Sequence, residues 1–200
     1  MQTRVNGHAC ADGGSLGALL RSDIAAWRDI WAGAVAVGGR VGLLTTLRMI
    51  WLFPGLRATF LYRLSHQLHR RGVKLLPQLV SQLNLTLHGL DIPASVPIGP
   101  RLYIPHPVGT VVMADRIGSN VTLVSGITIG MRKGPGFPTI GDNVYIGAGA
   151  RVLGNISIGS NVSIGANAVV LREVPDDSVA VGVPAQVRPA RQSDITEVRI

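Results

Sequence analysis

The 200-residue sequence is poor in cysteine, in aromatic residues and in charge. Cys10 is the single cysteine, so no internal disulfide can form, and a reducing compartment such as the cytoplasm is indicated. Aromatic residues make up 4% of the chain and charged residues 15%, whereas glycine occurs 25 times. Because nearly half of the residues are apolar, this composition argues against disorder and favours a repetitive β architecture.

Long apolar runs are also missing. Arg40, Arg48 and Arg57 interrupt the most apolar region, around residues 30–60, so no stretch reaches the 18 or so residues that a membrane span needs. Polar residues, including Asp12, precede any apolar run at the N-terminus, and we expect no secretory signal peptide there.

Acidic residues are absent between Asp29 and Asp91, although the chain as a whole has a net charge of +8. The same segment contains seven basic residues, namely Arg40, Arg48, Arg57, Arg63, Arg70, Arg71 and Lys74. A basic surface favours phosphates, anionic lipids or acidic saccharides, but a solvated face of amphipathic helices explains the pattern equally well. Peripheral contact of residues 40–74 with the inner face of a membrane is one hypothesis, and packing of these helices against each other is the alternative.

The first half of the chain has helical periodicity. Its apolar residues recur at steps of three and four from Leu16 to Trp31, with Ser15 as the expected N-cap. A second helix is predicted after Pro54-Gly55, ending at Gly72, and a third ends at Gly89. We therefore predict a loose segment over residues 1–14 and an α-helical cap and assembly domain over residues 15–90.

From residue 92 onward the period changes to six. The aliphatic positions of this repeat are Ile92, Ile98, Ile104, Val111, Ile117, Leu123, Ile129, Ile140, Ile146, Val152, Ile158, Ile164 and Val170. Each unit is a short strand followed by a turn that begins with glycine, which is expected to supply the backbone freedom of the corner. This repeat predicts a mainly β protein with a hexapeptide β-helix over residues 91–188, followed by a tail over residues 189–200.

The repeat is broken at two places. One extra residue is inserted at "IPHPVGT", around His106, and five extra residues extend the stretch from Met131 to Thr139. Because binding sites are often carried by irregular segments on a rigid scaffold, these breaks mark the candidate site.

Four stretches of the sequence resemble the serine acetyltransferase branch of the hexapeptide-repeat acyltransferases. They are "DIPASVPIGPRLYIPHPVGTVV", "VTLVSGITIG", "IGAGARVLGNISIGSNVSIGANAVV" and "VPDDSVAVGVPAQV". The resemblance implies a left-handed parallel β-helix that forms a homotrimer, with acetyl-CoA as co-substrate in the groove between neighbouring subunits. It also implies that His106 is the catalytic histidine and that Asp91 is its carboxylate partner. By the same resemblance, the acetyl-CoA cleft is lined by Gly130, Met131, Ala148, Gly149 and Ala166.

These residue types fit direct acetyl transfer. A histidine within hydrogen-bond reach of an acceptor hydroxyl can remove its proton as the oxygen attacks the thioester, and can return a proton to the departing thiolate. A carboxylate such as Asp91 would fix the imidazole tautomer and stabilise its charged form. No metal is expected, because the remaining histidines have no cysteine or carboxylate partners at ligand spacing. They are His8, His66, His69 and His88.

The sequence departs from the serine acetyltransferase pattern where that pattern binds the acceptor. Pro105 replaces an aspartate before the catalytic histidine, and Gly136 and Phe137 replace an arginine and a histidine. A carboxylate usually supplied by the helical domain is missing between residues 30 and 90. In these departures the sequence resembles the relatives found in extracellular and capsular polysaccharide biosynthesis. That resemblance implies a carbohydrate hydroxyl as the acceptor, with Tyr103, Tyr145 or Phe137 as a sugar platform.

Two alternatives remain open. The first is serine O-acetyltransferase with a rearranged pocket. The second is a non-catalytic solenoid that acts as a scaffold or binds nucleic acid through its basic helices. The spacing of Asp91 and His106 argues against the second alternative, as does the absence of aromatic residues interleaved with the basic ones, and no nucleic acid partner is expected.

Overall fold

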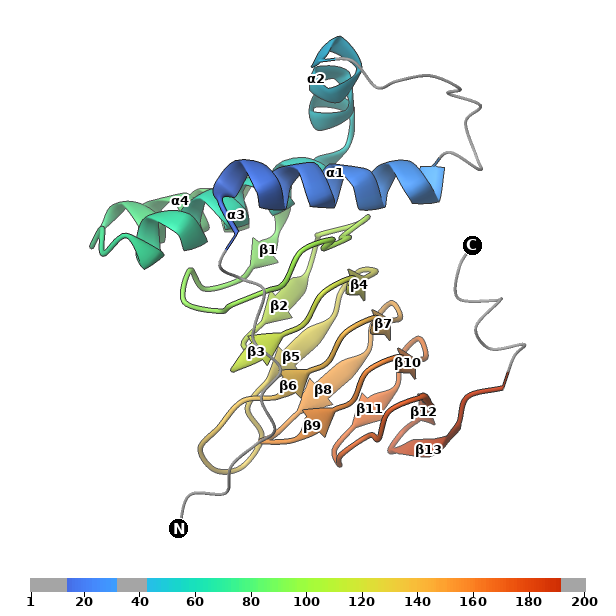
Figure 1. Cartoon of the computed structure of the whole chain (residues 1–200). Helices are drawn as coiled ribbons and strands as arrows, with labels where there is room; N and C mark the ends of the chain where they lie inside the picture. The colour runs from blue at the N-terminus through green and yellow to red at the C-terminus, as the bar shows by residue number, and fades with distance from the viewer. Residues whose placement is uncertain (1–13, 32–42, 192–200) are drawn as a thin grey trace.

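The computed structural model describes residues 14–31 and 43–191, in which helices cover one end of a stack of short strands (Figure 1). The helices are α1 (Leu16–Trp31), α2 (Leu43–Leu52), α3 (Pro54–Arg70) and α4 (Leu76–His88). The strands are β1 (Leu90–Asp91), β2 (Thr110–Val112), β3 (Arg116–Ile117), β4 (Thr122–Leu123), β5 (Thr128–Gly130), β6 (Thr139–Ile140), β7 (Tyr145–Ile146), β8 (Arg151–Leu153), β9 (Ser157–Ile158), β10 (Ser163–Ile164), β11 (Val169–Val170), β12 (Ser178–Gly182) and β13 (Ala185–Pro189). The predicted loose segment and most of the predicted tail lie outside the described residues.

The strands form three sheets, which the chain visits in turn. The first sheet has the order β1-β2-β5-β8-β11, the second β3-β6-β9, and the third β4-β7-β10-β12 with β13 added at its edge. Neighbours from successive turns of the chain are parallel, so that Val111 pairs with Thr128 and Thr128 with Arg151. Each circuit is therefore one coil of a β-helix, and the predicted left-handed parallel β-helix with an N-terminal α-helical cap is confirmed.

The six-residue column fills the interior of the coils. Its members from Ile117 to Val170 are all at most 1% exposed, and smaller residues such as Ala150 and Ala168 lie beside them. The prediction that Val111 points inward is wrong. Val112 is fully buried and pairs with Ile129, whereas Val111 is half-exposed, because the inserted segment at His106 shifts the register by one further residue.

The corners use glycine and asparagine for different purposes. The glycine that begins each turn keeps an ordinary backbone conformation, but a Cβ on Gly141 would lie 2.7 Å from the backbone of Gly159 in the next coil. Positive φ falls instead two residues later, at asparagines such as Asn143 and Asn161, both near 57°. Their side chains also donate to one another along the stack, with 3.0 Å between Asn143 Nδ2 and Asn161 Oδ1. The expectation that these glycines supply the backbone freedom of the corners is therefore wrong. Glycine is required at these positions because the coils stack closely.

The helix ends follow local sequence rules. Ser15 accepts a hydrogen bond from the backbone N–H of Ala18 at 3.3 Å, as an N-cap residue does. Pro54 and Pro77 lie in the first turns of α3 and α4, and Gly89 ends α4 with a φ of 65°. The predicted helix ends at Ser15 and Gly89 are thus confirmed.

A buried ion pair joins the helices to the first coil. Arg63 of α3 and Asp23 of α1 form a two-pronged contact, with 2.9 Å between Arg63 Nε and Asp23 Oδ2, and both side chains are fully buried. Arg63 also donates to the carbonyl oxygens of Ile98 and Gly99, and Asp23 accepts from the backbone N–H of Leu102. These contacts fix two helices and the first coil as one unit.

None of the helices in the described parts of the chain has the length and apolar character needed to cross a lipid bilayer. Phe53 packs against Trp27, with 5.2 Å between the ring centroids, whereas Trp51 is 78% exposed. Contact of this region with a membrane surface stays a prediction.

Candidate active site

His106 lies on an exposed corner of the first coil, between Tyr103 of the third sheet and β2 of the first. Its backbone N–H donates to the carbonyl oxygen of Val124 in the next coil at 3.2 Å. Pro107 is buried and accepts a hydrogen bond from the N–H of Thr110, which closes the inserted turn. The irregular segment is thus held by hydrogen bonds, and it presents the imidazole to solvent.

The helical cap packs closely on this corner from two sides. A Cβ on Gly55, at the start of α3, would overlap the carbonyl oxygen of Ile104. At the end of α4, the carbonyl oxygen of Gly89 accepts a hydrogen bond from the N–H of Gly109 at 3.0 Å. Residues 104–109 are therefore fixed between α3 and α4, with His106 in the middle of the segment.

Asp91 lies on β1, in the same sheet as the strand that follows His106. Its side chain is half-buried and follows the inward Leu90. Within the described residues, the side chains of Asp91 and His106 make no hydrogen bond with each other. Catalytic hydrogen bonds often tighten only when substrate is bound, so the pairing of these two residues stays a prediction.

The other predicted residues lie along two edges of the first sheet. Ala148, Gly149 and Ala166 follow strands of the third sheet, at the corners below His106. Backbone hydrogen bonds link these corners, because Gly149 donates to Ser125 and Asn167 donates to Ala148, both at 2.8 Å. Three predicted cleft residues and the histidine thus form one edge that runs along the stack of coils.

Gly130 and Met131 lie at the opposite edge of the first sheet. We call this the Met131 edge, and we call the edge with His106, Ala148, Gly149 and Ala166 the His106 edge. Gly130 ends β5, and Met131 is 53% exposed at the start of the long loop. A three-residue strand spans roughly 10 Å, so the face of the first sheet separates this pair from the His106 edge. Within one chain, the structure therefore does not bring the two groups of predicted cleft residues together.

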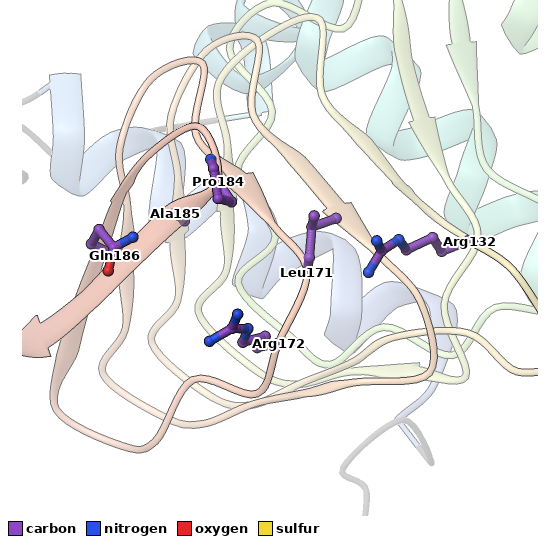
Figure 2. A pocket seen from close by; sticks show the side chains of 6 residues that line it. All are labelled: Arg132, Leu171, Arg172, Pro184, Ala185 and Gln186. Atoms are coloured by element: carbon purple, nitrogen blue, oxygen red, sulfur yellow. The ribbon is translucent and has the colours of Figure 1, made fainter.

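A small basic pocket lies at the Met131 edge (Figure 2). Its volume is about 190 Å³, and it is lined by Arg132, Leu171, Arg172, Pro184, Ala185 and Gln186. The two arginines come from the long loop and from the turn after β11, and the other polar side chain comes from β13. The sequence analysis included Arg132 only as part of the stretch from Met131 to Thr139 and missed Arg172, although both follow strands of the first sheet.

Tyr103 does not belong to any acceptor platform. It is 8% exposed, and its ring packs on Trp27 with 4.7 Å between centroids. The prediction of Tyr103 as a sugar-binding side chain is wrong, because this residue joins α1 to the first coil. Within residues 14–31 and 43–191, no group of three or more histidine, cysteine, aspartate or glutamate side chains is arranged to hold a metal ion.

Known proteins are similar to this chain over most of its length. The family model for bacterial transferase hexapeptides (six repeats) matches residues 137–172. Serine acetyltransferase from Mycobacterium tuberculosis is 44% identical over 147 residues, covering 72% of this chain and 64% of the relative. Serine acetyltransferase from Staphylococcus xylosus is 43% identical over 147 residues, covering 72% and 68%. The chain thus spans about two thirds of the length of these relatives, and slightly less for the first.

The structure of this chain is also similar to a solved structure of a serine acetyltransferase. Soybean serine acetyltransferase complexed with serine has a TM-score of 0.76 and 31% identity, covering 87% of this chain and 70% of that one.

These similarities contradict the hypothesis of a carbohydrate acceptor. A match over 72% of a 200-residue chain must include residues 60–140, so it contains the corner at His106 and the long loop. The relatives over that region are serine acetyltransferases, and the changes at Pro105, Gly136 and Phe137 therefore do not indicate another acceptor class. The alternative acceptor, serine, fits these relatives better than a carbohydrate of polysaccharide biosynthesis does.

Proposed function

Since this chain belongs to the serine acetyltransferase family, we propose that it transfers the acetyl group of acetyl-CoA to the side-chain hydroxyl of L-serine. The observation that carries this proposal is the 43% identity to a serine acetyltransferase over 147 residues, which cover 72% of this chain and 68% of the relative. Related structures with serine and with CoA bound have TM-scores of 0.76 and 0.74 to this chain. A reducing compartment, indicated by the single cysteine, is where we place the reaction.

His106 is the proposed general base. Its imidazole takes the proton from the serine hydroxyl as the oxygen attacks the carbonyl carbon of the thioester. The tetrahedral intermediate then collapses, the carbon–sulfur bond breaks, and the imidazolium gives its proton to the CoA thiolate. The products are O-acetyl-L-serine and CoA. The exposure of His106 on a corner fixed by α3 and α4 supports this role.

Asp91 is the proposed partner of the imidazole. A carboxylate that accepts from one ring nitrogen holds the other nitrogen ready to accept a proton, and it stabilises the imidazolium that forms. Asp91 lies on β1, which pairs with β2, the strand that follows the His106 corner. This position supports the role of Asp91.

Acetyl-CoA is proposed to bind between two subunits of a trimer. The predicted cleft residues lie on opposite edges of the first sheet, so a single ligand cannot contact both groups within one chain. In a closed threefold ring, the His106 edge of one subunit faces the Met131 edge of its neighbour, so both groups reach one ligand. Arg132 and Arg172, at the Met131 edge, are then available for the phosphate groups of CoA.

Product analysis tests the proposal. The purified chain is incubated with acetyl-CoA and either L-serine or L-alanine, and the products are identified by mass spectrometry. We expect O-acetyl-L-serine from the first acceptor and no acetylated product from the second, since L-alanine has no hydroxyl. Acetylation of both acceptors on the amino group would contradict the proposal.

A further inference from the structure

Arg57 of α3 is held by neutral partners beside the candidate active site. Its Nε donates to Nε2 of His88 at 3.4 Å, and its Nη1 donates to the carbonyl oxygen of Trp51. The ion pairs among the described residues are Asp23–Arg63 and Asp29–Arg101, so no carboxylate in this part of the chain neutralises the charge of Arg57. The Nη2 group makes no hydrogen bond with the described residues, and it remains available for a ligand.

His88 is oriented so that it serves Arg57 as an acceptor. Asn84 donates from Nδ2 to the carbonyl oxygen of Ala58 at 3.0 Å, which fixes its amide with Oδ1 toward the His88 ring. His88 Nδ1 then donates to Asn84 Oδ1 at 3.0 Å, and Nε2 keeps its lone pair for Arg57. Burial and the charge of Arg57 lower the pKa of His88, so the ring is neutral at neutral pH.

The place of Arg57 follows from the two contacts that fix the His106 corner. Gly55, two residues before Arg57, packs on the carbonyl oxygens of Ile104 and Pro105. His88 directly precedes Gly89, which packs on Val108 and Gly109. Arg57 thus bridges α3 and α4 where both helices meet residues 104–109, the segment that carries His106.

We infer that Arg57 binds the carboxylate of the amino-acid acceptor and positions its hydroxyl toward His106. The inference rests on the proposed function and adds a specificity-determining residue to it. A guanidinium matches a carboxylate with two parallel hydrogen bonds, and such charge-assisted bonds are the strong ones. Gly136 and Phe137 put no charge into the long loop at their positions, so a cation from the helical cap meets this requirement. His88 and Asn84 are positioning residues that hold the guanidinium in place.

The test compares L-serine with L-serinamide, in which a neutral carboxamide replaces the carboxylate. The variants are R57Q, H88Q and R71Q, the last being an arginine-to-glutamine change just after the far end of α3. Each protein is assayed for kcat and KM with both acceptors and with acetyl-CoA, after thermal melting has shown that it is folded.

We expect wild type to prefer L-serine over L-serinamide by about 10- to 100-fold in kcat/KM, the range for hydrogen bonds to a charged group. R57Q should lose most of this preference through a raised KM for L-serine, while its kcat/KM for L-serinamide and its KM for acetyl-CoA stay unchanged. H88Q should raise the KM for L-serine with kcat retained, and R71Q should behave as wild type.

Three results would overturn the inference. The first is an R57Q variant that prefers L-serine over L-serinamide as strongly as wild type does. The second is an R57Q variant whose kcat/KM falls equally for both acceptors. The third is a wild type with the same kcat/KM for the two acceptors. If R57Q does not fold, H88Q decides, because an unchanged KM for L-serine in a folded H88Q variant contradicts the network. A wild type that forms no O-acetyl-L-serine at all would instead overturn the proposed function, before any variant is compared.

Discussion

His106 owes its position to the residues that interrupt the repeat. Two prolines flank it, Pro107 is buried, and Gly109 adopts a φ of 71° that favours glycine. The interruption therefore produces an outward histidine at a point where a regular coil would place a small residue such as Ala148 or Ala166.

Replacing His106 by alanine should lower kcat by about 10²-fold or more, because the general base is lost. The KM for acetyl-CoA should change little, since the side chain is proposed to act on the acceptor proton. Asp91→Asn should also lower kcat, by disturbing the tautomer of the ring. Steady-state kinetics with both substrates measure these effects, and a near-normal kcat in H106A would show that His106 is not the base.

Arg172→Ala should raise the KM for acetyl-CoA about 10-fold, because a charge-assisted bond to a phosphate group is lost. The KM for L-serine and kcat at saturation should stay close to wild type. The same substitution at Arg188, which lies on β13 outside the pocket lining, is the matched control. A lower kcat with an unchanged KM for acetyl-CoA would contradict the role of Arg172.

Single residues were predicted from the sequence with mixed success. The inward column was predictable because its period is regular, but the register at Val112 was not, since an inserted turn can add residues on either side. The role of Asn143 and its equivalents was missed, because asparagine at a positive φ is recognised only once the corner is known. Arg57 was counted only as part of a basic surface, since its partner His88 is 31 residues away.

The cap is joined to the β-helix by the Asp23–Arg63 pair and its backbone acceptors. Five contacts meet at two fully buried side chains, so removal of one charge leaves the other buried and uncompensated. Because the same cap fixes the corner at His106, this pair also supports the geometry of the candidate site.

Asp23→Asn should reduce the free energy of unfolding by about 3–5 kcal/mol, the usual cost of breaking a buried ion pair. Asp29→Asn removes the partner of Arg101 in an ion pair whose side chains are 39% and 55% exposed, and it should cost about 0–1 kcal/mol. Urea denaturation followed by circular dichroism measures both values. Equal, small losses for the two variants would contradict the joining role of Asp23.

The helices themselves were predictable, whereas their docking was not. Pro54, Gly72 and Gly89 mark helix ends through rules that act over a few residues. The Asp23–Arg63 contact joins residues 40 positions apart, and no local pattern distinguishes Arg63 from the exposed arginines of the same segment.

The two edges of the first sheet imply that each active site is shared by two subunits. Deleting residues 132–136 restores the six-residue spacing between Ile129 and Ile140, so the β-helix should fold without the loop. This deletion variant and H106A should each be inactive alone. In randomly mixed trimers, about a quarter of the sites combine an intact histidine edge with an intact loop.

Each trimer that contains both variants has one intact site out of three. Co-expression of the two variants with different affinity tags, followed by purification of the trimers that carry both tags, should therefore recover about a third of wild-type activity. Light scattering at micromolar concentration should show a trimer. A monomer, or mixed trimers without recovered activity, would contradict the shared site.

The architecture of the whole molecule was the most predictable feature, because a six-residue period repeated over about 80 residues fits few other folds. The acceptor was the least predictable. The carbohydrate hypothesis was wrong because it treated the uncharged residues Pro105, Gly136 and Phe137 as the loss of a serine pocket. A cation can come from another element, and Arg57 is our candidate.

Steady-state acetyl transfer to L-serine tests the central claim most directly. CoA release is followed at saturating acetyl-CoA while L-serine is varied, and the same assay is repeated with free sugars and nucleotide sugars as acceptors. We predict L-serine-dependent release that saturates with a KM in the millimolar range or below, with one O-acetyl-L-serine formed for each CoA released. Release that is stimulated by a sugar and not by L-serine would contradict the account.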